Sequence, residues 1–380
     1  MLHFIKRCGK IGKRLTKKQR RAERITMKKL LLTICLLLLT ALLVACGNTA
    51  ESSADTSHTP LRDSEREPTD SASVTTTEEI LYPDVVFDTS PITGNEGEPL
   101  LIHWNPYLLS PAVPEEYESA FEKAITAILN HRRSVTYQDR NEFLAVRDNL
   151  FYEFPPSALS EIKPDADTLT LLFDYQYERE EHLARIEEFA DTVEKTVKEY
   201  LLFGDDDAEK ALLLYHAVSY RVDYFKTDFK DWQLNAYYAL TGNRAICYSF
   251  TDAYNYLLRQ VGVEAWLVRS YRPSDRAAHG WSLVKVGNAY YHCDTTWESS
   301  FCSGVGFYYF AMNDKRRANG IALSDATVGE GILKKPIPFA ANGSQFDKMS
   351  GDKYHYLTWQ IDRNARVLRY NGKQYPYDNE

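Results

Sequence analysis

The stretch HGWSLVKVGNAYYHCDTTW, at residues 279–297, predicts two β-strands that a Gly-Asn turn joins, so that Val286 faces Ala289. In that register, Asp294 lies two positions from the residue opposite His279. Diagonal neighbours of this kind share one face of a sheet, and long side chains can meet between them. The sequence therefore predicts a histidine and a carboxylate within reach of each other.

Upstream of this hairpin, a predicted helix begins at Cys247 and stops at Gly262. Its apolar residues recur at helical spacing: Phe250, Tyr254, Leu257, Leu258 and Val261. Free backbone N–H groups and the helix dipole at the first turn stabilise a thiolate, the nucleophilic form of cysteine. A cysteine on a partly apolar helix is nevertheless most often an inert core residue. The hairpin alone does not place Cys247 beside His279.

Four stretches of the sequence, AICYSF at 245–250, VGV at 261–263, HGW at 279–281 and YYHCDTTW at 290–297, together resemble the transglutaminase-like superfamily. The resemblance extends to residues 220–224 and 307–310 and is weaker over 110–200. It implies an α+β fold, a papain-like transglutaminase core in which a helix carrying Cys247 packs on an antiparallel β-sheet carrying His279 and Asp294. In such a triad the carboxylate orients the histidine, and the histidine activates the thiol.

The chain departs from the family pattern at three small residues. Ala245 and Ser249 stand where the family usually has glycine, and Gly280 stands where it often has alanine. The three reactive residues are retained, so the departures bear on the local backbone and on the approach of the substrate.

The resemblance implies a thiol enzyme that acts on amide bonds. The thiolate attacks an amide carbonyl to give a thioester, which water resolves in a peptidase or amidase and an amine resolves in a cross-linking transglutaminase. We expect hydrolysis, with extracellular peptide or protein amides as substrates and cell-wall peptide as one candidate. The alternative is a catalytically inactive binding or scaffold lipoprotein at the cell wall that retains the fold.

Four residues near the triad are candidates for substrate contacts. The backbone N–H of Cys247 is the first oxyanion donor, and Gln233 or Trp232 is the candidate side-chain donor. Trp281 and Trp297 flank the triad, where they either line a substrate cleft or, as is commoner for tryptophan, pack in the interior.

No metal or other cofactor is expected. The sequence has neither the Cys-x-x-Cys nor the His-x-x-x-His spacing of zinc sites among its four candidate ligands: His279, His292, Cys293 and Cys302. It also has no glycine-rich phosphate loop. The globular part carries an odd number of cysteines, which in an exported domain leaves at least one free thiol. Whether Cys293 pairs with Cys302 stays open at this point.

The N-terminus predicts an export signal. Met27-Lys28-Lys29 gives a positive start, residues 30–44 are almost wholly apolar, and LVAC at 43–46 resembles the lipobox of bacterial lipoproteins. The resemblance implies a lipid anchor on Cys46 and a place on the extracellular face of the cell membrane; the alternative is an uncleaved signal anchor. Residues 1–26 carry ten basic side chains, and are either a long cytoplasmic start of the signal or an extension before a true start at Met27.

Removal of residues 1–46 leaves 33 basic and 52 acidic side chains, a net charge of −19. So acidic a chain argues against nucleic acid as a partner. Residues 47–79 are rich in Ser, Thr, Asp and Glu and have too few apolar side chains to fold, which predicts a disordered tether.

The remainder divides into three predicted parts: an N-terminal helix and strand region at 80–204, the transglutaminase-like core at 205–330, and a C-terminal β-hairpin extension at 331–380 that turns at Asn371-Gly372. Helices are expected at 114–133 and 178–203, and a strand at 167–177. Asp206 and Glu209 have the spacing of a capping box at the start of a further helix.

Overall fold

The computed structural model describes residues 84–225, 234–302, 306–350, 359–370 and 373–377. The chain divides into two units, Met1–Glu78 and Glu79–Glu380, and every described residue belongs to the second. The predicted signal with Cys46, the tether, Trp232, Gln233 and the turn at 371–372 lie outside the described residues. In the part that is described, no helix has the length and apolar character needed to cross a membrane.

A five-stranded antiparallel sheet, with strand order β10-β9-β6-β7-β8, carries one of the three predicted catalytic residues, His279, and a second, Asp294, directly follows its last strand. Its strands are β6 (Ala265–Tyr271), β7 (Ala278–Val286), β8 (Ala289–Cys293), β9 (Thr327–Val328) and β10 (Lys335–Pro336). Val286 pairs with Ala289 and Ser282 with Cys293, so the predicted hairpin register is confirmed. A short parallel pair joins β4 (Asp223–Tyr224) to β5 (Arg244–Ala245), and β5 lies just before the cysteine helix in sequence.

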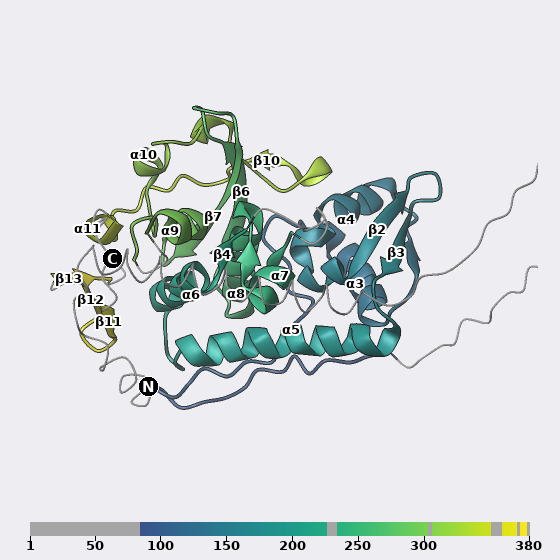
Figure 1. The fold of residues 1–380 in the computed structure, drawn as a ribbon, viewed down its shortest axis with the longest axis horizontal. Helices are drawn as coiled ribbons and strands as arrows, with labels where there is room; N and C mark the ends of the chain where they lie inside the picture. Colours follow the sequence, from purple (N-terminus) through teal and green to yellow (C-terminus); the bar gives the residue numbers. More distant parts are fainter. Residues whose placement is uncertain (1–83, 226–233, 303–305, 351–358, 371–372, 378–380) are drawn as a thin grey trace, which may run out of the picture. The chain divides into compact units, whose positions relative to one another are not determined.

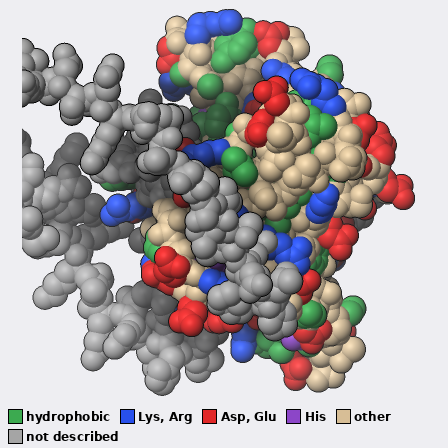
Figure 2. All heavy atoms as spheres, turned by 90° about the vertical axis from the view of Figure 1, so that its right-hand side faces the viewer, with side chains coloured by type: hydrophobic (Ala, Val, Ile, Leu, Met, Phe, Trp, Pro, Cys, Tyr) green, Lys and Arg blue, Asp and Glu red, His purple; other side chains and the backbone are tan. Residues whose placement is uncertain are grey.

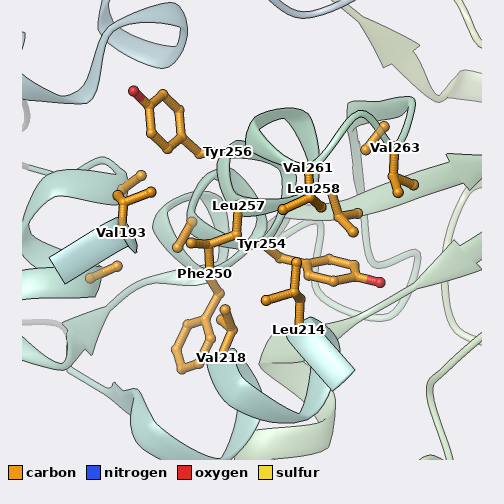
Figure 3. Packing of buried hydrophobic residues seen from close by; sticks show 14 of the residues in the cluster. Val193, Leu214, Val218, Phe250, Tyr254, Tyr256, Leu257, Leu258, Val261 and Val263 are labelled. Carbon is orange, nitrogen blue, oxygen red and sulfur yellow. The ribbon is translucent and has the colours of Figure 1, made fainter. Parts of the chain in front are cut away.

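Helix α8 (Cys247–Gln260) packs on β6 and β7 and is surrounded by other helices. Those helices are α6 (Asp207–Arg221), α7 (Ala236–Gly242) and α9 (Thr295–Cys302). The predicted apolar face is buried: in Figure 3, Phe250 and Leu257 of α8 are grouped with Val218 of α6 and Val193 of α5 (Arg179–Tyr200). Gly262 follows with φ of +79°, the left-handed backbone that glycine adopts at helix ends.

The N-terminal region adds helices and a second sheet to the same core. It consists of α3 (Glu115–Leu129), β1 (Ser134–Thr136), α4 (Arg140–Glu153), the 3₁₀ turn at Pro155–Leu159, β2 (Ser160–Asp165) and β3 (Thr170–Tyr175), with strand order β1-β3-β2. Figure 1 shows α5 running along this region and along the helices of the cysteine-bearing half. The expected helices at 114–133 and 178–203 and the strand at 167–177 are confirmed; α4 and β2 were not predicted.

Residues before α3 tie the N-terminal segment to α8. The indole Nε1 of Trp104 donates to the hydroxyl of Tyr256 at 2.6 Å, and its backbone N–H donates to Glu194 Oε1 at 2.8 Å. Asn105 exchanges two hydrogen bonds with the Gln260 side chain, at 3.0 and 2.9 Å. The helix that carries Cys247 is therefore braced by contacts with residues 152 and 155 positions earlier in the chain.

A third sheet forms at the C-terminus from β11 (Trp359–Asp362), β12 (Val367–Tyr370) and β13 (Lys373–Pro376). β12 and β13 pair with Tyr370 opposite Lys373, and β11 joins them as a third strand. Arg363 makes two contacts with the buried Asp205, at 2.5 and 3.0 Å, which attaches this sheet before α6. At that point Asp206 and Glu209 form the predicted capping box.

The remaining elements are short and connect these sheets: α10 (Asp314–Arg317), α11 (Asp347–Ser350) and 3₁₀ turns at Leu323–Asp325 and Gly331–Leu333. On the face drawn in Figure 2, acidic and basic side chains of the described residues are interspersed among polar and apolar ones.

Candidate active site

Cys247 is the first residue of α8 and is 8% exposed. Because it begins the helix, its sulfur lies at the end where backbone N–H groups are free and the helix dipole is positive. Its side chain interacts with that of His279, which β7 presents from its second residue, and the interaction raises the pKa of the imidazole. The contact that the hairpin pattern left undetermined is therefore present.

His279 contacts Asp294 through Nε2 and Oδ2, at 2.7 Å. The carboxylate is an acceptor, so Nε2 carries the hydrogen and Nδ1 is the nitrogen left to act as a base. Asp294 follows β8 directly and caps α9: its Oδ1 accepts from the backbone N–H of Trp297 at 2.9 Å. The carboxylate is thus held by a helix start as well as by the histidine.

The electrostatics of the pair favour its ionic form. Burial by itself lowers the pKa of His279, but the charge and hydrogen bond of Asp294, with a smaller contribution from Cys247, raise it above its usual value. Burial raises the pKa of Asp294, yet His279 and then Arg317 outweigh burial and hold it below its usual value. A carboxylate that stays ionised beside an imidazole is what a thiol base needs.

Arg317 is a residue of the site that the sequence did not reveal. Its Nη1 lies 3.1 Å from Asp294 Oδ2, with both side chains fully buried. The residue is the last of α10, in a DKRR run whose composition predicts a solvated surface turn. No spacing or motif linked it to the hairpin.

The two candidate cleft tryptophans occupy different environments. Trp281 is 0% exposed, and its Nε1 donates to His292 Nδ1 at 2.9 Å, so it takes the packing role rather than lining a cleft. Trp297 is partly exposed and stacks on His279, with ring centroids 5.0 Å apart and planes at 22°. Trp297 therefore covers the imidazole at the edge of the site.

The segment that carries these three residues matches a known family. Residues 194–295 match the family model of the transglutaminase-like superfamily. This segment is a transglutaminase-like domain. It contains Cys247, His279 and Asp294, begins within α5, and ends before α10, so Arg317 lies outside the matched range.

Two solved structures are similar to the chain. One is a candidate cysteine protease from Cytophaga hutchinsonii, with 15% identity over 34% of this chain and 39% of that chain and a TM-score of 0.26. The other is a TGase, with 13% identity over 32% of this chain and 34% of that chain and a TM-score of 0.25. The chain thus spans little more than a third of either. No curated protein matches it.

The predicted α+β class with antiparallel sheets is confirmed.

Gly280 of the transglutaminase-like domain is fitted to Tyr248, the neighbour of Cys247. A Cβ at position 280 would lie 2.4 Å from Tyr248 Cδ1, much closer than carbon atoms approach. The presence of glycine where the family often has alanine is explained by this ring.

We expect Gly280→Ala to destabilise the protein by about 1–3 kcal/mol, because the Tyr248 ring must move or the strand must shift. Urea unfolding measures the loss. Gly242→Ala is the matched control, since a Cβ there meets no atom within 4 Å among the described residues. Equal stability of the two variants would contradict the assignment, and Tyr248→Ala should relieve the Gly280→Ala defect.

Two further cysteines lie near the site, Cys293 at the end of β8 and Cys302 at the end of α9. Cys293 and Cys302 do not pair, and the sulfur of Cys293 accepts from the backbone N–H of Ala311 at 3.4 Å. Within the described ranges, no group of three His, Cys, Asp or Glu side chains is placed to hold a metal ion.

Proposed function

We propose that this protein is a thiol enzyme that acts on peptide or protein amides through Cys247, His279 and Asp294. The observation that supports this most directly is the buried His279–Asp294 contact at 2.7 Å, with Cys247 close enough to the same imidazole to raise its pKa. Nucleophile, base and orienting carboxylate then act in sequence, as thiol catalysis requires.

In the proposed reaction, Nδ1 of His279 takes the thiol proton and the thiolate of Cys247 attacks the amide carbonyl carbon. The C–N bond of the tetrahedral intermediate breaks, the leaving amine takes the proton from His279, and a thioester remains on sulfur. Water, deprotonated by His279, then attacks the thioester and releases a carboxylic acid and the thiol. Asp294 stabilises the imidazolium in both halves of the reaction.

The hydrolytic outcome, the substrate and the location are part of the proposal. Water is the resolving nucleophile that we favour, with extracellular peptide, cell-wall peptide included, as the substrate class. The charge of −19 left after residue 46 fits peptide better than polyanions. We place the protein on the extracellular face of the membrane, with a lipid on Cys46.

Iodoacetamide labelling of Cys247 tests the proposal, and Cys302 is a built-in control because it is also 8% exposed. We expect Cys247 to label faster than Cys302 at pH 6 to 7, because His279 is placed to take the proton of the Cys247 thiol. Peptide mass spectrometry separates the two sites. In His279→Ala, the advantage of Cys247 should disappear.

Equal, slow labelling of both cysteines, unaffected by His279→Ala, would contradict the proposal of a thiol enzyme. It would favour the alternative, a binding module on the same fold. Fast labelling lost in the variant justifies a screen of peptide amides for turnover.

A further inference from the structure

Arg317 is a fully buried guanidinium that shares one oxygen atom with the proposed base. Asp294 Oδ2 is 2.7 Å from Nε2 of His279 and 3.1 Å from Nη1 of Arg317. Arginine is almost never fully buried unless it is paired, because desolvation of the charge is costly. One carboxylate therefore faces two positive groups when His279 is protonated.

Two indole rings hold the guanidinium in place. Its central carbon lies 4.5 Å from the Trp281 ring and 4.3 Å from the Trp297 ring. The attraction between a cation and an indole ring is strongest where water is excluded, as it is around this buried side chain. Since Trp297 also stacks on His279, the imidazole and the guanidinium share one aromatic wall.

The helix that carries Arg317 is itself attached to the sheet. Asp314, at the other end of α10, contacts Nε2 of the buried His292 on β8 at 2.9 Å and accepts from the backbone N–H of Ala341 at 3.1 Å. His292 in turn accepts from the Trp281 indole. One end of α10 is therefore anchored on β8 through His292, and the other end is anchored on Asp294, the residue that follows β8.

We propose that Arg317 is a positioning residue of the site: it fixes the Asp294 carboxylate in its ionised form and weakens the hold of that carboxylate on the proton of His279. The proposal rests on the function proposed above for Cys247, His279 and Asp294. Without Arg317, the full charge of Asp294 would act on His279 and the imidazole would release its proton to the leaving amine less readily. Arg317 thus sets the strength of the acid and base.

The direction of the charge effects agrees with this role. Burial and the contact with His279 have the largest effects on the pKa of Asp294, and the charge of Arg317 lowers this pKa further. For His279, burial and the contacts with Asp294 and Cys247 have larger effects, and the charge of Arg317 lowers the pKa of the imidazole. Other titratable groups face the cluster from α6, α8, β8, α9 and the segment that follows α9: Tyr215, Cys247, His292, Cys293, Glu298 and Tyr309. The test must therefore change Arg317 and leave these groups in place.

The test is an NMR titration of the His279 imidazole in the full chain, with Cys247→Ala as background so that the thiol does not contribute. Arg317→Met keeps an apolar stem between the tryptophans and removes the charge. We expect it to move the His279 midpoint upward by about one pH unit, since an opposing cation has been removed. Arg317→Lys, which keeps the charge, should move the midpoint less. An unchanged midpoint in folded Arg317→Met would overturn the proposal.

If Arg317→Met does not fold, Asp314→Asn provides the second measurement, because it loosens α10 without touching Asp294. Loss of the Asp314 charge alone would move the midpoint slightly downward, so an upward shift supports the positioning role and a downward or absent shift overturns it. The titration needs no turnover. If the protein shows no turnover but Arg317→Met moves the His279 midpoint upward, the proposed enzyme function is wrong and the role of Arg317 is retained.

Discussion

Replacing Asp294 with asparagine is expected to lower the turnover of an amide substrate about 10⁴-fold, measured on the folded fraction of the variant. Asparagine keeps the shape of the side chain but loses the charge that stabilises the imidazolium. Its amide group can also donate to Nε2 of His279, which would move the ring hydrogen to Nδ1, the atom that must accept the thiol proton. Hydrolysis of a peptide amide found by library screening gives the measurement.

Asp252→Asn is the control for that experiment. Asp252 is a buried aspartate on the same helix as Cys247, and it accepts from the backbone N–H of Ala236 at 2.8 Å. Burial raises its pKa to about 8, so it is largely protonated at neutral pH and asparagine replaces a neutral group. Its turnover should stay within a few-fold of the unchanged protein. A loss below about tenfold in Asp294→Asn would argue against the proposed role of the carboxylate.

The second large effect concerns stability. Glu153→Ala is expected to cost about 3–5 kcal/mol, because it leaves the guanidinium of Arg259 poorly exposed to water and unpaired. Nη1 of Arg259 contacts Glu153 Oε2 at 2.5 Å, and the carboxylate also accepts from the backbone and hydroxyl of Ser110 at 2.7 and 2.6 Å. This pair joins the end of α4 to the end of α8. Urea unfolding, with an unchanged slope, would measure the loss.

Asp174→Ala is the matched surface change. The Lys163–Asp174 pair has a similar distance, 2.6 Å, but both side chains are more than half exposed. Exposed pairs contribute about 0–1 kcal/mol, so this variant should lose little. Similar losses in the two variants would show that the Glu153 contact is not the support we assign. Replacement of both Glu153 and Arg259 by methionine should cost less than Glu153→Ala alone.

The parts of the fold that the sequence predicted are those set by local physics. A two-residue turn fixes which residues of β7 and β8 face each other, so the approach of His279 to Asp294 follows from the turn and the strand pattern alone. Helical spacing and a glycine stop likewise predicted α8 and its buried face. The position of Cys247 over His279 required the family resemblance, since the two elements are separated by another strand, β6.

Contacts between distant segments could not be predicted in this way. Arg317 meets Asp294 across 23 residues, and Arg259 meets Glu153 across 106. Neither contact leaves a periodic pattern or a motif in the sequence, because the sequence around a charged residue looks the same whether its side chain faces water or a buried partner. The sequence also did not distinguish Trp281 from Trp297. Both lie beside the site, but Trp281 is in the interior and Trp297 is at the edge of the site.

The bracing of α8 by Trp104 and Asn105 has a consequence for how this protein can be cut into pieces. A fragment trimmed to residues 194–295 would expose the side of α8 that these two residues cover and would also lack Arg317. The smallest piece that retains every contact of the site therefore begins before residue 104 and continues past residue 317. Cleavage between those limits would leave the helix of the nucleophile joined to its supports by noncovalent contacts alone, whereas cleavage before residue 84 would leave them on one continuous chain.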